Sequence, residues 1–361
     1  MTATSNLRLD HYKRQAKNLL KHVRAGDPDA RLRFQHAHPE GDILLASGRL
    51  LLSDSQLVIA REWGFGSWAK FKHALLFGQA VAALDAGDLA PLDALLHHHP
   101  WLIQYRQRLG PWYESGYFAG AMLLHHVAGN PIRGPIPANI LDVTRLLLQH
   151  GANPNAATLL GATTCKLLLT SLQASEAGVA VPLCELLIAA GARNELSDPD
   201  VLSSPLRNGA PATAAALVRR GAVMDLRHAA ALGALDRVQA LLDAGVDADL
   251  CEEALFFACL HRQQESARLL LHYGASGSRL IPPGDPHART ALHDAAGRGY
   301  LEMVLLLLEH RVDATVVDPQ FGGTARGWAR HEGHAQVVAA LEPYLQHQNH
   351  SSTSPGDTGS Q

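Results

Sequence analysis

The sequence predicts an all-α protein made of stacked helical hairpins, and three observations support this fold class. Hydrophobic residues make up 47% of the 361 residues and aromatic residues only 6%, which suits helices packed through Ala and Leu. A segment ending in Leu-Leu-x-x-Gly-Ala recurs along the chain. No stretch approaches the roughly 18 uncharged apolar residues of a membrane-spanning helix, so the array is predicted to lie outside the bilayer.

The recurring segment combines a buried helix face with a signal that ends the helix. Apolar residues three and four positions apart form one buried face, and the glycine that follows can adopt a left-handed conformation. Successive glycines are spaced 40, 30, 24 and 29 residues apart, at Gly151, Gly191, Gly221, Gly245 and Gly274. Counting weaker copies, about eight helix-pair units are predicted between residues 79 and 345.

The clearest copy begins at Thr290-Ala-Leu-His-Asp-Ala-Ala-Gly-Arg-Gly299. It resembles the ankyrin signature Thr-Pro-Leu-His-x-Ala-Ala-x-x-Gly, with Ala291 in place of Pro. A more polar copy at 323–341 resembles a terminal ankyrin repeat. The resemblance implies an ankyrin-repeat solenoid over 79–345, in which each unit packs on its neighbours.

Residues 1–78 do not repeat, and their charge differs from that of the array. They carry 12 Lys/Arg against 7 Asp/Glu, whereas residues 79–361 carry 19 against 27. Their motifs Arg14-Gln-Ala-Lys-Asn-Leu-Leu20 and 56–68 resemble an N-terminal segment of bacterial ankyrin-repeat proteins. This resemblance implies a bacterial origin and a small N-terminal helical domain, but no particular activity.

The chain is therefore expected to have three parts: the helical domain at 1–78, the repeat array at 79–345 and a tail at 346–361. The tail has almost no apolar residues and is expected to be disordered. No secretory signal is recognisable, and the four cysteines lie in apolar helical patterns. A cytoplasmic protein with reduced thiols is predicted.

The stretch 101–118 is the strongest candidate for a binding site. It holds six of the 20 aromatic residues and falls between repeats, where the resemblance implies a projecting loop. Trp, Tyr and Arg are enriched at binding hot spots. The predicted partner-binding residues are Tyr105, Arg106, Arg108, Trp112, Tyr113 and Tyr117. The alternative is an enlarged loop that only covers the neighbouring core.

The 21 histidines raise the question of a metal site. His331 and His334 do not have the His-Glu-x-x-His spacing that places two ligands one helical turn apart. His125 and His293 fall at the signature position, where the resemblance implies hydrogen bonds to neighbouring backbone. We expect no metal and no cofactor. No nucleophile elbow, phosphate loop or paired-carboxylate motif is present, so we expect no enzymatic activity.

An open stack of hairpins offers a concave surface without a closed pocket, which suits a macromolecular partner better than chemistry. The sequence thus predicts a monomeric protein–protein interaction module that uses its concave face and the loops between repeats. One alternative is a small-molecule or enzymatic site in the enlarged second and third repeats. Another is nucleic-acid binding through the basic helices of 1–78. The helix pair at 53–76 suits a helix-turn-helix, but its second helix is poor in exposed Arg, Asn and Gln, so nucleic acid is disfavoured.

Overall fold

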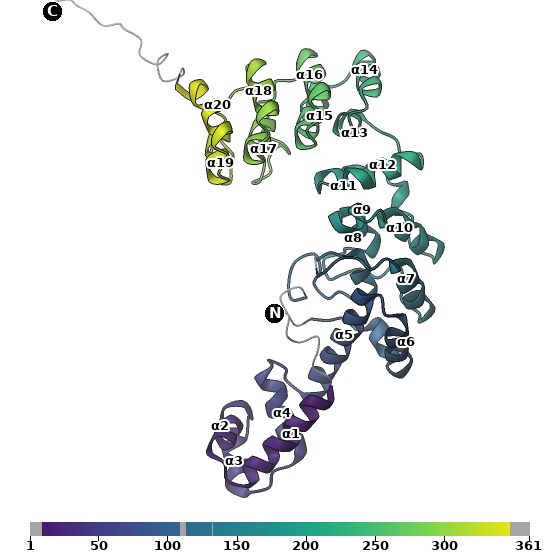
Figure 1. Ribbon diagram of the computed structural model, residues 1–361, viewed down its shortest axis with the longest axis vertical. Helices are drawn as coiled ribbons and strands as arrows, with labels where there is room; N and C mark the ends of the chain where they lie inside the picture. Colours follow the sequence, from purple (N-terminus) through teal and green to yellow (C-terminus); the bar gives the residue numbers. More distant parts are fainter. Residues whose placement is uncertain (1–8, 109–112, 132, 347–361) are drawn as a thin grey trace, which may run out of the picture. The chain divides into compact units, whose positions relative to one another are not determined.

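The computed structural model describes residues 9–108, 113–131 and 133–346 (Figure 1). Helices account for 61% of these residues, and none of them belongs to a β-strand. The all-α class is therefore confirmed for the described part of the chain. Most of the predicted tail, residues 347–361, lies outside it.

The chain divides into two compact units, Met1–Asn194 and Glu195–Gln361. The helices of the first unit are α1 (Leu9–Arg24), α2 (Pro28–Ala37), α3 (Gly41–Ser47), α4 (Leu52–Glu62), α5 (Trp68–Ala86), α6 (Leu89–His98), α7 (Ile140–Gln149), α8 (Thr164–Thr170), α9 (Leu172–Glu176) and α10 (Ala180–Ala189). Two 3-10 helices also belong to it, η1 (Pro100–Gln104) and η2 (Leu123–Ala128).

The second unit consists of helical hairpins stacked side by side (Figure 1). Its helices are η3 (Glu195–Ser197), α11 (Ser203–Arg207), α12 (Pro211–Arg219), α13 (Leu226–Ala231), α14 (Leu235–Asp243), α15 (Ala248–Leu260), α16 (Gln264–His272), α17 (Ala291–Gly297), α18 (Leu301–Glu309), α19 (Ala325–His331) and α20 (Ala335–Gln346). No described helix has both the length and the apolar character that a bilayer crossing requires.

A separate aromatic core holds the N-terminal helices together. Tyr12 of α1 is fully buried and meets the rings of Trp63 and Phe71 edge-on, at 5.7 and 4.9 Å between centroids. Phe65 and Trp68 pack against the same cluster. The aromatic residues around the α4–α5 turn thus pack on α1.

The helix α5 connects the N-terminal helices to the repeats without a break. The predicted domain boundary at residue 78 falls inside it, because Gly78 keeps a helical conformation there. Ser67 caps its start by accepting a hydrogen bond from the backbone N–H of Lys70 at 3.2 Å. Gly87, with φ +71°, ends it in the left-handed conformation.

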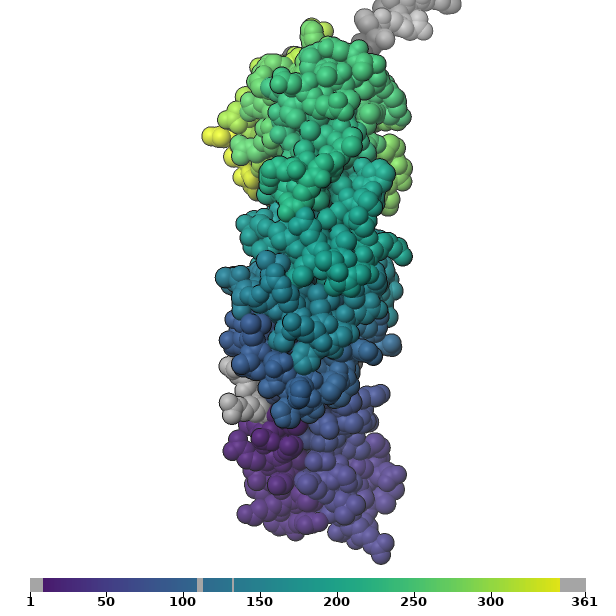
Figure 2. All heavy atoms as spheres, turned by 90° about the vertical axis from the view of Figure 1, so that its right-hand side faces the viewer, coloured from purple at the N-terminus to yellow at the C-terminus, as the bar shows by residue number. Residues whose placement is uncertain are grey.

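Small side chains let neighbouring repeats of the second unit approach closely. Ala229, Ala254 and Ala295, on α13, α15 and α17, are fully buried in one cluster that extends to α19. Leu and Val side chains of α14, α16 and α18 cover the other side of this cluster. In the space-filling view, successive segments of each unit lie against one another in the order of the sequence (Figure 2).

The uneven repeat spacing has a structural cause. Three inter-repeat loops are hairpins closed by single antiparallel bridges, Ala157 with Thr163, Ile281 with Arg289 and Val317 with Thr324. By contrast, the connections from α12 to α13 and from α14 to α15 are short turns without a bridge among the described residues. The 24-residue spacing between Gly221 and Gly245 therefore belongs to a repeat that has a short turn on either side.

Enlarging a side chain at the contact between repeats should destabilise the second unit. We expect Ala295→Leu to cost about 1–3 kcal/mol, because the added atoms have no space between α17 and its neighbours. The matched control is Ala240→Leu on the exposed face of α14, which should change stability by less than about 0.5 kcal/mol. Urea unfolding followed by circular dichroism measures both, and equal effects would contradict the packing argument.

Candidate partner-binding surface

The segment that begins at Trp101 folds back onto the first repeats. Tyr105 packs against Trp101 and against Phe77 of α5, with 5.5 Å between ring centroids in each pair. Its ring also lies edge-on to His73 at 6.0 Å. Desolvation by this packing raises the pKa of the Tyr105 hydroxyl. Tyr105 is therefore mainly a packing residue, as the alternative for this loop proposed.

Arg106 fastens the same segment to the hairpin at 157–163. Its guanidinium donates to the carbonyl oxygens of Gly120, at 3.1 Å, and Ala157, at 2.7 Å. The backbone N–H of Leu159 donates in turn to the carbonyl of Ala119 at 2.8 Å. These bonds join two loops that are some 40–50 residues apart in the sequence into one surface.

Tyr113 also belongs to the interior. Its hydroxyl lies 2.9 Å from Nε2 of His126, whose Nδ1 contacts the carbonyl of Met122 at 2.9 Å. Desolvation raises the pKa of Tyr113 to about 12 and holds that of His126 well below its ordinary value. The pair is thus neutral, and replacing Tyr113 would disturb folding as well as any binding.

Of the six predicted residues, Arg108 and Tyr117 have exposed side chains. The Tyr117 ring is 47% exposed, and its hydroxyl donates to Oδ1 of Asn130 at 2.6 Å. Trp112 lies outside the described residues. The structure adds two residues that were not predicted: Leu159 is 54% exposed and Leu160 is 70% exposed at the hairpin tip.

Leu159 and Leu160 could have been recognised from the sequence. They follow the turn at Asn153-Pro-Asn155 and precede the helix that Thr163 caps, so they have no place in a helical pattern. Two consecutive large apolar residues outside any helix indicate either a buried loop or an exposed contact. In the structure, the side chains of Leu159 and Leu160 are exposed.

The signature histidines stabilise the starts of the inner helices. Nδ1 of His293 lies 2.7 Å from the hydroxyl of Thr290, and Nε2 lies 2.9 Å from the carbonyl of Gly323 in the next repeat. His125 forms the equivalent contact with the carbonyl of Ala156 at 3.2 Å. The predicted backbone role of both histidines agrees with this geometry.

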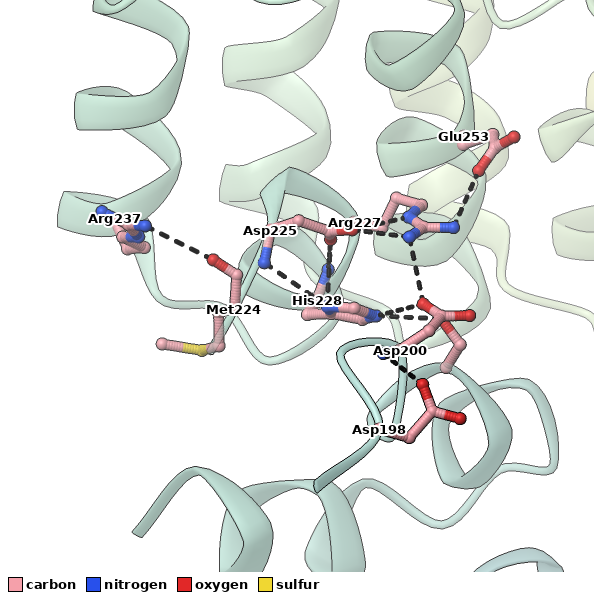
Figure 3. A network of polar contacts seen from close by, with 9 residues as sticks. Asp198, Asp200, Met224, Asp225, Arg227, His228, Arg237 and Glu253 are labelled. Atoms are coloured by element: carbon pink, nitrogen blue, oxygen red, sulfur yellow. Dashed lines mark hydrogen bonds and ion pairs between the residues drawn. The ribbon is translucent and has the colours of Figure 1, made fainter. Parts of the chain in front are cut away.

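A charged network joins the first three repeats of the second unit (Figure 3). The guanidinium of Arg227 lies 2.6 Å from Asp225, 3.1 Å from Asp200 and 3.3 Å from Glu253. These carboxylates come from the loop before α11, from the start of α13 and from α15. One arginine therefore links three successive repeats. Burial alone would raise the pKa of Asp225, but hydrogen bonds from Arg227 and the His228 backbone lower it.

The same network superficially resembles a catalytic triad. Ser203 Oγ lies 2.9 Å from His228 Nε2, and Asp225 Oδ1 lies 3.0 Å from Nδ1. However, the Ser203 hydroxyl donates to Asp200 at 2.5 Å, and the backbone N–H of Asp225 points at Nδ1. The Ser203 hydroxyl proton is thus directed at the Asp200 carboxylate and not at the histidine ring. Both Ser203 and His228 are also buried.

A metal ion fits this position poorly. Ligand atoms of Asp200, Asp225 and His228 lie within 4.8 Å of one another, which is compatible with a small cation. Arg227 already pairs with both carboxylates, and His228 already contacts Ser203. A cation would have to displace these contacts, so the cluster is explained as a structural ion pair.

Comparison with known protein families bears on this unit. Residues 226–318 match the family described as ankyrin repeats (three copies). This segment is an ankyrin-repeat array. A comparison with curated proteins found no match for the chain. The match includes α13 to α18, so the predicted ankyrin fold is confirmed there, while the number of repeats over 79–345 stays a prediction.

The second unit presents its own hairpin tips. Phe321 is 72% exposed at the tip of the hairpin that starts at Val317. Nδ1 of His287, in the preceding hairpin, contacts the side chain of Gln320 at 2.7 Å, so the two tips support each other. Both units thus expose apolar side chains on loops held by hydrogen bonds.

Acid should destabilise the protein through its buried histidines. Desolvation lowers the pKa of five rings, those of His125, His126, His228, His261 and His293. Below pH ~6.5 the unfolded chain binds protons that the folded chain does not, so stability is full above about pH 7 and falls with decreasing pH. The loss should continue down to the folded-state values, about 4 for His125.

Urea unfolding at pH 7.5, 6.0 and 5.0 measures this loss, which should reach about 1.4 kcal/mol per pH unit for each ring. His125→Gln should reduce the slope in the first unit, whereas His310→Gln, at an exposed position, should leave it unchanged. Stability that stays flat between pH 7.5 and 5.0 would refute the assignment of neutral buried rings.

Removing the central arginine should weaken the ankyrin array. Arg227→Met leaves three neighbouring carboxylates without a counter-charge, and we expect a loss of about 1–2 kcal/mol because they are only partly buried. Arg268→Met, at an exposed position on α16, is the matched control and should be nearly neutral. If both variants unfold at the same urea concentration, the network does not stabilise the stack.

Proposed function

We propose that this chain is a non-catalytic binding protein that recognises a protein partner through the loops between its repeats. The observation that carries the proposal is the exposure of Leu159 and Leu160 at the tip of the 157–163 hairpin. They lie beside the segment of Arg108 and Tyr117, and large apolar, tyrosine and arginine side chains together have the composition of a binding hot spot.

The way this surface is held also supports binding. Arg106 and the backbone of Ala119 fix the two loops to each other before any partner arrives. Binding to an ordered surface avoids much of the entropy that loops lose on association. The concave faces of the repeats and the Phe321 tip are further surfaces that a large partner could use.

The burial of reactive groups supports a non-catalytic role. The cysteines of the described residues are buried and form no disulfide: Cys165, Cys184, Cys251 and Cys259. Desolvation raises the pKa of Cys251 and Cys259, so their nucleophilic thiolate is disfavoured. Four thiols outside any disulfide fit a reducing compartment, and we propose a cytoplasmic protein on this basis. The monomeric state stays a prediction from the sequence. The bacterial origin implied by residues 1–78 stays a prediction.

Polar substitutions on the proposed surface should abolish partner capture. A Tyr117→Ser, Leu160→Asp variant removes exposed apolar area, so we expect at least a tenfold loss of the partner in quantitative pull-downs from the native cell. Leu305→Asp on α18 is the control, since Leu305 is also partly exposed but lies outside this surface. Undiminished capture by the double variant, with an unchanged unfolding curve, would exclude the loops of the first unit as the site.

A further inference from the structure

Helix α1 carries a row of cations on the side opposite its buried face. Its buried residues are Tyr12, Ala16, Leu19 and Val23. At about 100° per residue, five exposed cations fall within an arc of roughly 100° on the other side. They are Lys13, Arg14, Lys17, Lys21 and Arg24. Asp10 is the one acidic residue of this helix.

Most of this charge is not neutralised by the protein itself. Lys13 pairs with Asp10 at 3.2 Å, and Arg24 donates to the carbonyl of Leu50 at 2.6 Å. Within the described residues, Arg14, Lys17 and Lys21 have neither an ion pair nor a side-chain hydrogen bond. The row therefore attracts anions without first having to break internal contacts.

The composition of the row favours one kind of partner. A membrane surface is disfavoured because such a helix inserts its apolar side, and that side of α1 is buried against Phe71 and Val58 in the N-terminal core. A protein partner is disfavoured because lysine is depleted in protein interfaces. Phosphates of a nucleic acid suit lysine and arginine equally and need no apolar contact.

We propose that α1 binds the sugar–phosphate backbone of a nucleic-acid duplex without reading its sequence. Lys13 to Arg24 extends over about 17 Å at 1.5 Å per residue, enough to reach several phosphates. Asn18, exposed beside the row, offers an additional donor. The sequence leaves nucleic-acid binding by the basic helices of 1–78 as an alternative and disfavours a helix-turn-helix at 53–76, because its second helix is poor in exposed Arg, Asn and Gln. In the structure Phe65 and Trp68 of that pair pack into the N-terminal core, whereas the row of cations described above lies on α1.

The salt dependence of the binding constant distinguishes phosphate binding from nonspecific adsorption. The full chain is titrated into a fluorescent 20-base-pair duplex at 50 and 200 mM NaCl, with anisotropy as the readout. If three phosphates are neutralised, the slope of log affinity against log salt is about −2.7, a loss of about 40-fold between the two conditions. The variant Arg14→Gln, Lys17→Gln, Lys21→Gln should lose this slope and bind at least tenfold more weakly at 50 mM.

The matched control removes the same charge elsewhere. Arg219, Arg268 and Arg330 are exposed in the second unit, and the triple change of these to Gln should leave duplex binding within twofold of the original protein. Circular dichroism should show both variants folded, because none of the six side chains is buried. An equal loss in both variants, no binding at 50 mM, or binding to phosphatidylserine vesicles but not to the duplex would each overturn the proposal.

Discussion

Burial of alanine- and leucine-lined helix faces between successive hairpins is the constraint on which this structure depends. A single hairpin of the ankyrin array cannot cover its own apolar side, so α13, α15 and α17 gain their core only by stacking. The stacking fixes the helices and leaves the connecting loops free to differ. Loop length, hairpin formation and exposed side chains can therefore vary without disturbing the core, which is why the candidate surfaces lie on loops.

The sequence was most informative where local chemistry and stacking agree. The resemblance to the ankyrin signature implied a backbone contact for His293, and the structure shows its Nε2 2.9 Å from the carbonyl of Gly323. The glycine spacing predicted repeats but did not reveal which connections form hairpins. The form of each connection depends on contacts between residues of different repeats. Examples are the contacts of Arg227 with Asp200 and Glu253, which are 27 and 26 positions away in the sequence.

Composition alone could not tell packing from binding in the 101–118 segment. Tyr105 and Tyr113 have the side chains of a hot spot, yet both complete the core next to the 3-10 helices that replace a regular first helix in this repeat. A shorter, irregular helix leaves space that rings from a neighbouring loop must fill. Leu160 is exposed for a different reason. It lies at the tip of a tight hairpin, where no neighbouring core is available to bury its side chain.

The ion pairs of Arg227 have a consequence for how the array responds to force. Nearest-neighbour stacking alone would let repeats peel off one at a time, each with its own small barrier. A guanidinium shared by three layers makes the middle layer's release depend on both others. Under tension, the part of the second unit from Asp200 to Glu253 should therefore be stiffer than the repeats that follow it.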